Sequence, residues 1–280
     1  MKQVNLEKIL KDKKAPIDKY PKPVLNIGLY FIKKVFHLKK INEFISIYGD
    51  TKGIEFIKQV FSYINFQIKS NKKPEEFLPE KSGLIIVANH PLGALDGLGL
   101  INLIHSYRKD VKIVVNDILS NIDNLEEFFL PVDLYGTKSQ KQNLLDITKA
   151  IKEEKIVVFF PAAKVSRLID NKIKDEKWNK GAISFARKFN KPILPIFVDS
   201  RNTYLFYFAI KIKDFFAPFL LPREMFKKQN KILKFKIGET ISPSIFDSIN
   251  DDQKLTDLFK KAVYNIDDMP KELMAHKQTD

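Results

Sequence analysis

The chain has 280 residues, of which 44% are hydrophobic, so it is long and apolar enough to bury a sizeable core. This composition excludes a disordered chain. Because the sequence contains no Cys, it also excludes disulfides, thiolate metal sites and a cysteine nucleophile.

The formal net charge is +14, from 48 Lys and Arg against 34 Asp and Glu. Such an excess favours an acidic partner, which can be nucleic acid, an anionic membrane or an acidic carrier protein. Only five of the basic residues are Arg, the side chain that reads bases and phosphates through its planar fork. We therefore favour a membrane surface or a carrier protein and expect no nucleic-acid partner. A coding bias toward Lys, Ile, Asn and Phe would give the same charge.

The start of the chain, residues 1–16, lacks the apolar core of a signal peptide. No run of the sequence approaches the ~18 apolar residues that span a bilayer. We expect an intracellular protein that can lie on a membrane without crossing it.

Residues 24–69 predict two helices on either side of the break YGDTKG. One face of the first helix is apolar and carries Leu25, Leu29, Ile32 and Phe36. Lys33 and Lys34 lie outside this face. Such a helix either rests on an anionic surface or packs on the domain. We expect residues 1–70 to form an N-terminal helical segment that can associate with a membrane and residues 71–280 an α/β domain, with the Lys/Pro-rich SNKKPEEFLPEKSG at the boundary.

From residue 83, short β-rich runs alternate with helical stretches. The predicted strands are GLIIVA, VKIVVN, PVDLY, KIVVFFP, PILPIFVD and ILKFKIGE, and the predicted helices lie around 97–108, in QKQNLLDITKAIKEE and around 177–189. Near-continuous apolar strands separated by helices indicate an α/β sheet covered on both faces. In such sheets, ligands bind where strands give way to loops.

The segment NHPLGALDG follows the first of these strands directly. His90 therefore stands at a strand end, Pro91 and Gly93 turn the chain, and Asp96 opens the next helix. A carboxylate bonded to one ring nitrogen of His90 would stabilise the imidazolium and leave the other nitrogen free to accept a proton. Equally, Asp96 can simply cap the helix while His90 satisfies a loop carbonyl.

A second strand end carries FFPAAKVSR, residues 159–167. Lys164, Ser166 and Arg167 can hold an anionic head group there, and the small residues before them would let it approach the backbone. The alternative is an ordinary solvated loop. A third apolar strand, PILPIFVD, is framed by Pro192 and Pro195.

In this order and at these intervals, the three motifs resemble the PlsC-type glycerolipid and lysophospholipid acyltransferases, over about residues 53–245. They look most like a bacterial subgroup of ornithine- and glycine-lipid acyltransferases with NHPLGGLDG-like and FPAG-x-x-SR motifs. The segments VVND, DEKWNKGAISFA, RNTYLFY and MFKKQNKILKFKIGETI are also similar to that subgroup. The resemblance implies a mixed, mostly parallel sheet flanked by helices, with an N-terminal helical hairpin.

The resemblance also implies an activity, the transfer of a fatty acyl group from acyl carrier protein or coenzyme A to a lyso-lipid hydroxyl. His90 would be the general base and Asp96 the group that orients it. The acceptor-binding residues would be Lys164, Ser166, Arg167, Gly93 and Lys138. No cofactor, no metal and no covalent enzyme intermediate is implied.

The sequence departs from the usual family pattern in three places. Five residues, not four, separate His90 from Asp96; Ala162 replaces the Glu of the FPEG motif; and Lys138 is the nearest cation where the family has an Arg. The bidentate phosphate clamp is thus incomplete. An amino-acid-containing lyso-lipid fits at least as well as glycerol 3-phosphate or lysophosphatidic acid.

A long-chain acceptor must be drawn from a bilayer, so we expect an interfacial surface in the first helix or in residues 204–222. The latter combine apolar and basic side chains, namely Phe215, Phe216, Phe219 and Leu220 with Lys211 and Lys213, although any one aromatic can instead belong to the core. The expected location is peripheral, on the cytoplasmic face of the inner membrane. We expect His37, His105 and His276 to be structural or solvent-exposed.

Two other function classes compete with this interpretation. A non-catalytic module that binds membranes or nucleic acid would use the charge, but it leaves the three ordered motifs unexplained. A hydrolase would need a nucleophile elbow of the G-x-S-x-G type, which the sequence lacks, as it lacks a P-loop and a G-x-G-x-x-G loop.

Overall fold

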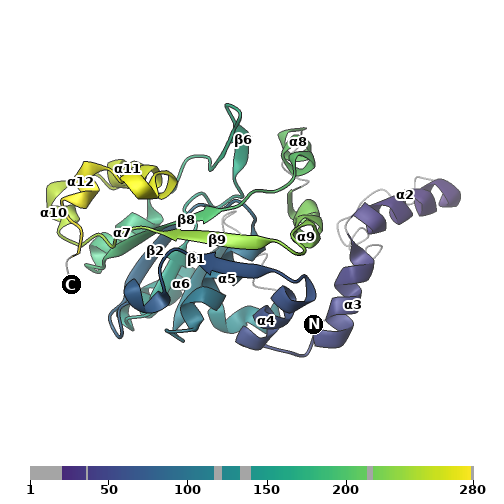
Figure 1. Ribbon diagram of the computed structural model, residues 1–280, viewed down its shortest axis with the longest axis horizontal. Coiled ribbons are helices and arrows are strands. Elements are labelled where there is room, and N and C mark those ends of the chain that lie inside the picture. Colours follow the sequence, from purple (N-terminus) through teal and green to yellow (C-terminus); the bar gives the residue numbers. More distant parts are fainter. Residues whose placement is uncertain (1–20, 36, 117–121, 133–139, 213–216, 279–280) are drawn as a thin grey trace.

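The structure is a computed structural model that describes residues 21–35, 37–116, 122–132, 140–212 and 217–278. Its centre is a seven-stranded sheet with the strand order β1-β9-β8-β2-β5-β3-β4 (Figure 1). The strands, in chain order, are β1 (Gln67–Ser70), β2 (Leu84–Ala88), β3 (Val111–Asn116), β4 (Phe129–Val132), β5 (Ile156–Phe159), β8 (Ile193–Asp199) and β9 (Ile232–Ile237). All neighbouring strands are parallel except β8 and β9, so the mixed, mostly parallel sheet is confirmed.

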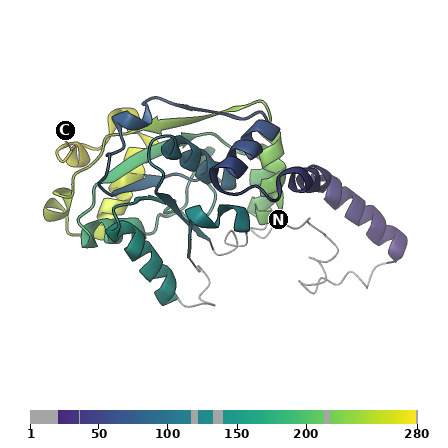
Figure 2. The same cartoon turned by 90° about the horizontal axis from the view of Figure 1, so that it is seen from below.

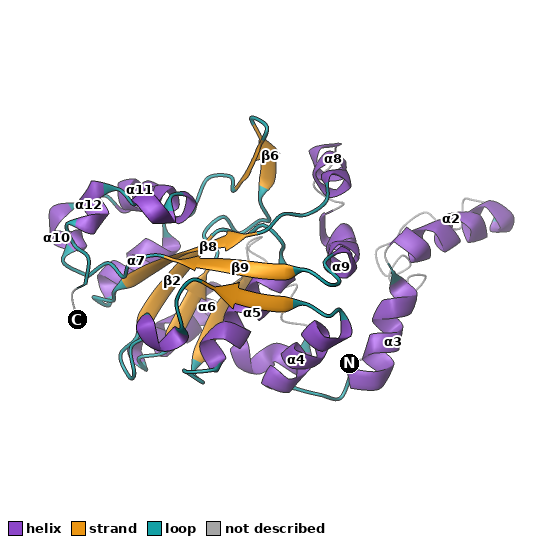
Figure 3. Cartoon of the chain, in the orientation of Figure 1, coloured by secondary structure: helices purple, strands orange, loops and turns teal. Residues whose placement is uncertain are grey.

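Helices cover both faces of this sheet (Figure 3). One face carries α4 (Gly53–Tyr63) and α5 (Ala94–His105), and the other carries α6 (Gln140–Lys152), α7 (Gly181–Lys188) and α11 (Asp252–Tyr264). Strand β2 is apolar throughout because both of its faces are buried. Leu84, Ile86 and Ala88 belong to the hydrophobic core on the side of α4 and α5, while Ile85 and Val87 belong to the core on the side of α6, α7 and α11.

The predicted strands of the α/β region are confirmed, with small shifts at their ends. Of the stretch PVDLY, the described part is strand up to Val132, and the rest lies outside the described residues. The predicted helices become α5, α6 and α7, and α7 is shorter than expected because it begins at Gly181. Not predicted were β1 and a two-stranded hairpin of β6 (Arg167–Ile169) and β7 (Lys172–Lys174).

The N-terminal segment has one helix more than the sequence predicts. The first expected helix is divided into α2 (Lys22–Val35) and α3 (Leu38–Tyr48), and between them His37 has a left-handed backbone with φ of 52°. Figures 1 and 2 both show α2 extending away from the sheet. Strand β1 lies within residues 1–70 and pairs with β9, while the division of the chain into two domains stays a prediction.

The remaining described elements either connect strands of the sheet or follow its last strand. They are α8 (Tyr204–Ile212), α9 (Ala217–Lys227), α10 (Ile245–Ser248), α12 (Lys271–Met274) and three 3₁₀ helices, Pro74–Glu76, Asp123–Phe128 and Ile266–Asp268. Within the described ranges, no helix combines the length and the apolar character that a bilayer crossing needs.

Three loops meet at one edge of the sheet because β2, β5 and β8 are parallel neighbours. The loop after β2 carries His90, the loop after β5 carries FFPAAKVSR, and the loop after β8 leads into α8. This is the edge at which parallel sheets bind their ligands.

Candidate active site

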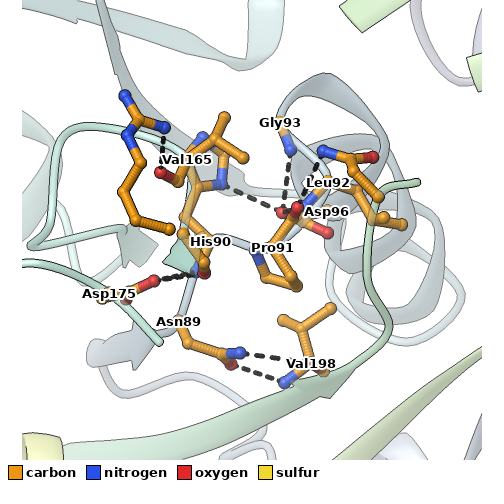
Figure 4. Close-up of polar contacts among 12 residues, drawn as sticks. Asn89, His90, Pro91, Leu92, Gly93, Asp96, Val165, Asp175 and Val198 are labelled. Atoms are coloured by element: carbon orange, nitrogen blue, oxygen red, sulfur yellow. Dashed lines mark hydrogen bonds and ion pairs between the residues drawn. The ribbon is translucent and has the colours of Figure 1, made fainter. Parts of the chain in front are cut away.

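His90 and Asp96 face each other across the turn between β2 and α5 (Figure 4). Nδ1 of His90 lies 3.1 Å from Oδ2 of Asp96, whose side chain is fully buried. The turn is shaped by Gly93, which has φ of 82° and stands just before the first residue of α5. The side chains expected to pair therefore do so in the structure.

The same Asp96 carboxylate fixes the backbone of the turn. Its Oδ2 accepts hydrogen bonds from the main-chain N–H groups of Leu92, at 2.8 Å, and Gly93, at 3.1 Å. The contact with Nδ1 of His90 has the length of a hydrogen bond but not its direction. Burial raises the pKa of Asp96, while the His90 ring and the two N–H groups oppose that rise.

The His90 ring is held on its face by a neighbouring aromatic side chain. Phe160, at the end of β5, stacks on it with ring centroids 4.3 Å apart and an interplanar angle of 28°. The His90 side chain is 17% exposed, and among the described residues its Nε2 has no hydrogen-bond partner. This nitrogen is the position at which the imidazole can accept a proton from a substrate.

The loop after β5 is bonded directly to the His90 turn. The main-chain N–H of Ser166 donates to the His90 carbonyl at 2.8 Å, and the Ser166 hydroxyl donates to Oδ1 of Asp175 at 2.5 Å. Asp175 also accepts the main-chain N–H of His90, at 3.3 Å (Figure 4). This bond completes a small ring of contacts with Ser166.

Asp175 belongs to the candidate site, and the sequence analysis did not single it out. It is buried, and its second oxygen accepts the indole N–H of Trp178 at 2.9 Å. Its main-chain N–H donates to the hydroxyl of Tyr264, whose pKa is raised by burial. The signal in the sequence was the Trp three positions later, since a buried indole N–H needs an acceptor.

Two Asn side chains connect the turn to β8 and to the segment that follows it. Asn89 donates to the Val198 carbonyl at 3.1 Å and accepts the Val198 N–H at 2.7 Å. Asn202 donates from Nδ2 to the Pro91 carbonyl at 3.0 Å, and its own N–H donates to the hydroxyl of Tyr207. Burial raises the pKa of Tyr207 to about 12, so this hydroxyl stays neutral near pH 7.

The remaining predicted site residues occupy different positions. Lys164 is exposed on the loop after β5, and Arg167 is half-buried, with its guanidinium donating to the Val165 carbonyl at 2.6 Å. Ser166 is buried and donates its hydroxyl to Asp175. Lys138 lies outside the described residues. The acceptor-binding roles of these residues stay predictions.

A pocket of about 230 Å³ opens beside the turn. Asn89, Pro91 and Ser166 line one side of it, and Arg201, just before α8, lines another. The described residues contain no group of three or more His, Asp or Glu that could hold a metal ion.

The other His residues make contacts of their own. His37 and His105 pack against the rings of Phe226 and Phe128, and partial burial lowers the pKa of each. Both ring nitrogens of His276 lie at hydrogen-bond distance from Ser hydroxyls, 2.8 Å and 3.0 Å away.

The chain is similar to known acyltransferases. The family described as Acyltransferase matches residues 9–269. A lyso-glycine lipid O-acyltransferase of Phocaeicola vulgatus is 27% identical over 275 residues, which cover 94% of this chain and 95% of that protein. The protein of the same name from Bacteroides thetaiotaomicron is 28% identical over 271 residues, which cover 94% of this chain and 97% of that one.

Among solved structures, the fold is similar to that of PlsC, the 1-acyl-sn-glycerophosphate acyltransferase of Thermotoga maritima. The TM-score is 0.50 at 16% identity, over 86% of this chain and 97% of that one. At this identity the likeness concerns the fold.

Proposed function

This chain belongs to the acyltransferase family as a PlsC-type lipid O-acyltransferase, and we propose that His90 is its general base and Asp96 the group that orients it. The observation that carries this proposal is the 3.1 Å contact between Nδ1 and the buried Asp96 carboxylate, on the ring side away from Nε2. A carboxylate in that position favours the neutral tautomer with its proton on Nδ1. It also stabilises the imidazolium that forms when Nε2 takes a second proton.

The reaction follows from these two groups. Nε2 removes the proton from the acceptor hydroxyl as its oxygen attacks the carbonyl carbon of the acyl thioester. The carbon–oxygen bond forms, the carbon–sulfur bond breaks, and the imidazolium returns the proton to the departing thiolate. The products are an ester and a free thiol, and His90 is neutral again. Base catalysis of this kind contributes about 10²- to 10⁴-fold to the rate.

We propose that the acceptor is a lyso-lipid with an amino-acid head group. The two relatives with 27% and 28% identity are both named for a lyso-glycine lipid acceptor. A carboxylate head group needs a cation, and the loop bonded to the His90 turn offers Lys164 and Arg167. The donor in this proposal is an acyl carrier protein or coenzyme A thioester, both of which are acidic.

We further propose that the protein acts as a peripheral enzyme on the cytoplasmic face of the plasma membrane. Its charge of +14 supports attraction to anionic lipid, where each basic residue near the surface contributes about 1 kcal/mol. The same charge would attract the acidic donor to the lipid-bound enzyme.

The test compares the purified wild-type protein with His90→Ala and, as a matched control, His105→Ala. Each is incubated with labelled acyl carrier protein or labelled acyl-coenzyme A and a panel of lyso-glycine lipid, lyso-ornithine lipid and lysophosphatidic acid. We expect diacyl product with an amino-acid lyso-lipid, a loss of about 10²-fold or more in His90→Ala, and normal activity in His105→Ala. Equal product from His90→Ala would exclude His90 as the base, and product with lysophosphatidic acid alone would exclude the proposed acceptor.

A further inference from the structure

Helix α8 carries apolar side chains on two opposite faces. One face is buried, where Phe206, Tyr207 and Ile210 form a small core with Val165 and Leu220. On the other face, four large side chains stand in solvent: Tyr204 is 64% exposed, Leu205 51%, Phe208 67% and Ile212 67%. A helix with apolar side chains on both faces is expected where protein or lipid covers both of them.

These four exposed residues form a single stripe. At about 100° per residue, positions 204, 205, 208 and 212 fall within roughly 100° of the helix circumference, opposite the buried face. We call this set of four residues the α8 stripe. Scattered single apolar residues on a surface are ordinary, but a contiguous group marks a contact surface.

The α8 stripe is flanked by positive charge. The guanidinium of Arg201 lies over the Tyr204 ring, 5.2 Å from its centroid, and donates to the Tyr204 hydroxyl at 3.0 Å. Lys211, in the last turn of the helix, is exposed. A short helix with an apolar stripe and basic neighbours suits the boundary between head groups and acyl chains of an anionic bilayer.

The position of α8 connects this stripe to the His90 turn. Asn202, two residues before the helix, is bonded to the Pro91 carbonyl, and Val165 of the loop after β5 packs against its buried face. Ile173 of β7 packs against the same small core, and in Figure 1 the β6–β7 hairpin and α8 extend from the same side of the sheet. Leu168 of that hairpin is also 38% exposed.

We propose that the α8 stripe is the surface that inserts into an anionic membrane, so that a lyso-lipid enters the His90 turn directly from the bilayer. The occupant is lipid rather than a second copy of the chain, because the flanking groups Arg201 and Lys211 match anionic head groups and would repel each other across a symmetric interface. The delivery of the acceptor rests on the proposed function, whereas the adsorption to membranes does not.

The experiment measures flotation with vesicles of phosphatidylglycerol and phosphatidylethanolamine. It compares the wild-type protein with Leu205→Ser/Phe208→Ser and with a control, Leu144→Ser/Leu145→Ser, which removes two α6 side chains that are 49% and 50% exposed. We expect the partition coefficient of the α8 variant to fall about tenfold or more and that of the control to change less than twofold. Circular dichroism and thermal melting of all three proteins verify that the fold is retained.

Acyl transfer in detergent, acyl transfer in vesicles and sedimentation distinguish membrane binding by the α8 stripe from self-association and from a loss of catalysis. Acyl transfer to a detergent-solubilised acceptor should be unchanged in the α8 variant, and transfer to acceptor in vesicles should fall with binding. Wild-type flotation by the α8 variant, or an equal loss in the control, would overturn the proposal. So would a loss of self-association in sedimentation without a loss of flotation, which would assign the stripe to a second copy. Flotation that depends on α8 without any acyl transfer would support the surface and refute the proposed function.

Discussion

The main-chain N–H of Ser166 donates to the main-chain carbonyl of His90, and Asp175 accepts both the Ser166 hydroxyl and the His90 N–H. Hydrogen bonds therefore connect the loop after β2 to the loop after β5. The position of the His90 ring should therefore depend on Ser166 and Asp175, and this dependence can be measured.

Replacing Asp96 with Asn should separate catalysis from stability. Asn keeps an oxygen for the N–H groups of Leu92 and Gly93 but has no charge to stabilise the imidazolium, so kcat should fall by about 10²- to 10⁴-fold. Because burial raises the pKa of Asp96, the folded state holds this proton more tightly than the unfolded chain, and ionisation above pH ~3.9 costs stability.

The Asn variant avoids that cost, so its free energy of unfolding at pH 7 should equal or exceed that of the wild type. Urea unfolding and steady-state kinetics on the same preparations give both values. A variant that loses stability and activity together would indicate that Asp96 is mainly structural.

Replacing Asp175 with Asn should move the His90 turn without removing a reacting group. An amide in place of the carboxylate cannot accept from Ser166, His90 and Trp178 as strongly, so we expect kcat to fall by about 10- to 100-fold. The apparent pKa of the pH–rate profile should shift, while KM for the thioester stays nearly constant.

Trp178→Phe is the control for Asp175, because it removes one bond on the side away from His90. It should reduce the melting temperature but leave the pH–rate profile in place. If both variants merely melt earlier and keep a normal profile, Asp175 has no positioning role.

Gly93→Ala should disrupt the turn. Gly93 has φ of 82°, and a Cβ there would lie 3.0 Å and 3.1 Å from the two terminal methyl groups of Leu221. The strain should cost about 1–3 kcal/mol in unfolding free energy and reduce activity. Gly181→Ala, at the first residue of α7, is the matched control, since no atom lies within 4 Å of its Cβ position.

For Gly181→Ala we expect a gain of about 0.5–1 kcal/mol and unchanged activity. Chemical unfolding of the two variants and the wild type measures these differences in unfolding free energy. Equal stability of the two Ala variants would contradict the conformation assigned to Gly93.

Stability should also depend on pH through Asp252, far from the site. Partial burial pushes the pKa of Asp252 up, but the Ser184 hydroxyl and the Arg187 guanidinium outweigh it, so the pKa lies below its usual value. The stabilisation is therefore complete above the unfolded pKa of ~3.9 and is lost as pH falls through the lower folded pKa.

Asp252→Asn should reduce the unfolding free energy at pH 7 by about 1 kcal/mol, a modest value because the pair is partly exposed and screened by solvent. The difference from the wild type should shrink as pH is lowered from about 5 to 3. A constant difference over this range would show that Asp252 does not titrate as assigned.

Much of the fold could be predicted because buried strands have a strong sequence signature. LIIVA and IVVF are apolar on both faces; Asn89 follows the first directly, and Pro161 comes two residues after the second. Strand β1 escaped prediction because QIKS is a polar edge strand of four residues. The β6–β7 hairpin has strands of three residues, and its signal was the turn at Asp170 and Asn171, which both have positive φ.

The candidate site could be predicted only where its parts are close in sequence. His90 and Asp96 are six positions apart, and one turn of backbone brings them together. Asp175 and Asn202 join them through hydrogen bonds over 85 and 111 positions, and no local pattern encodes such pairs. Phe160 lies in the predicted strand KIVVFFP, but its stacking on His90 depends on the order of β2 and β5 in the sheet.

These long-range bonds also set the order in which the enzyme is completed during synthesis. His90 and Asp96 leave the ribosome early, but the groups that hold their turn arrive 85 and 111 residues later. Closing loops of this length costs entropy that is recovered only when the strands between them have paired. A nascent chain that ends before Asn202 thus contains both His90 and Asp96 but lacks the hydrogen bond from Asn202 to Pro91 that helps to hold their turn.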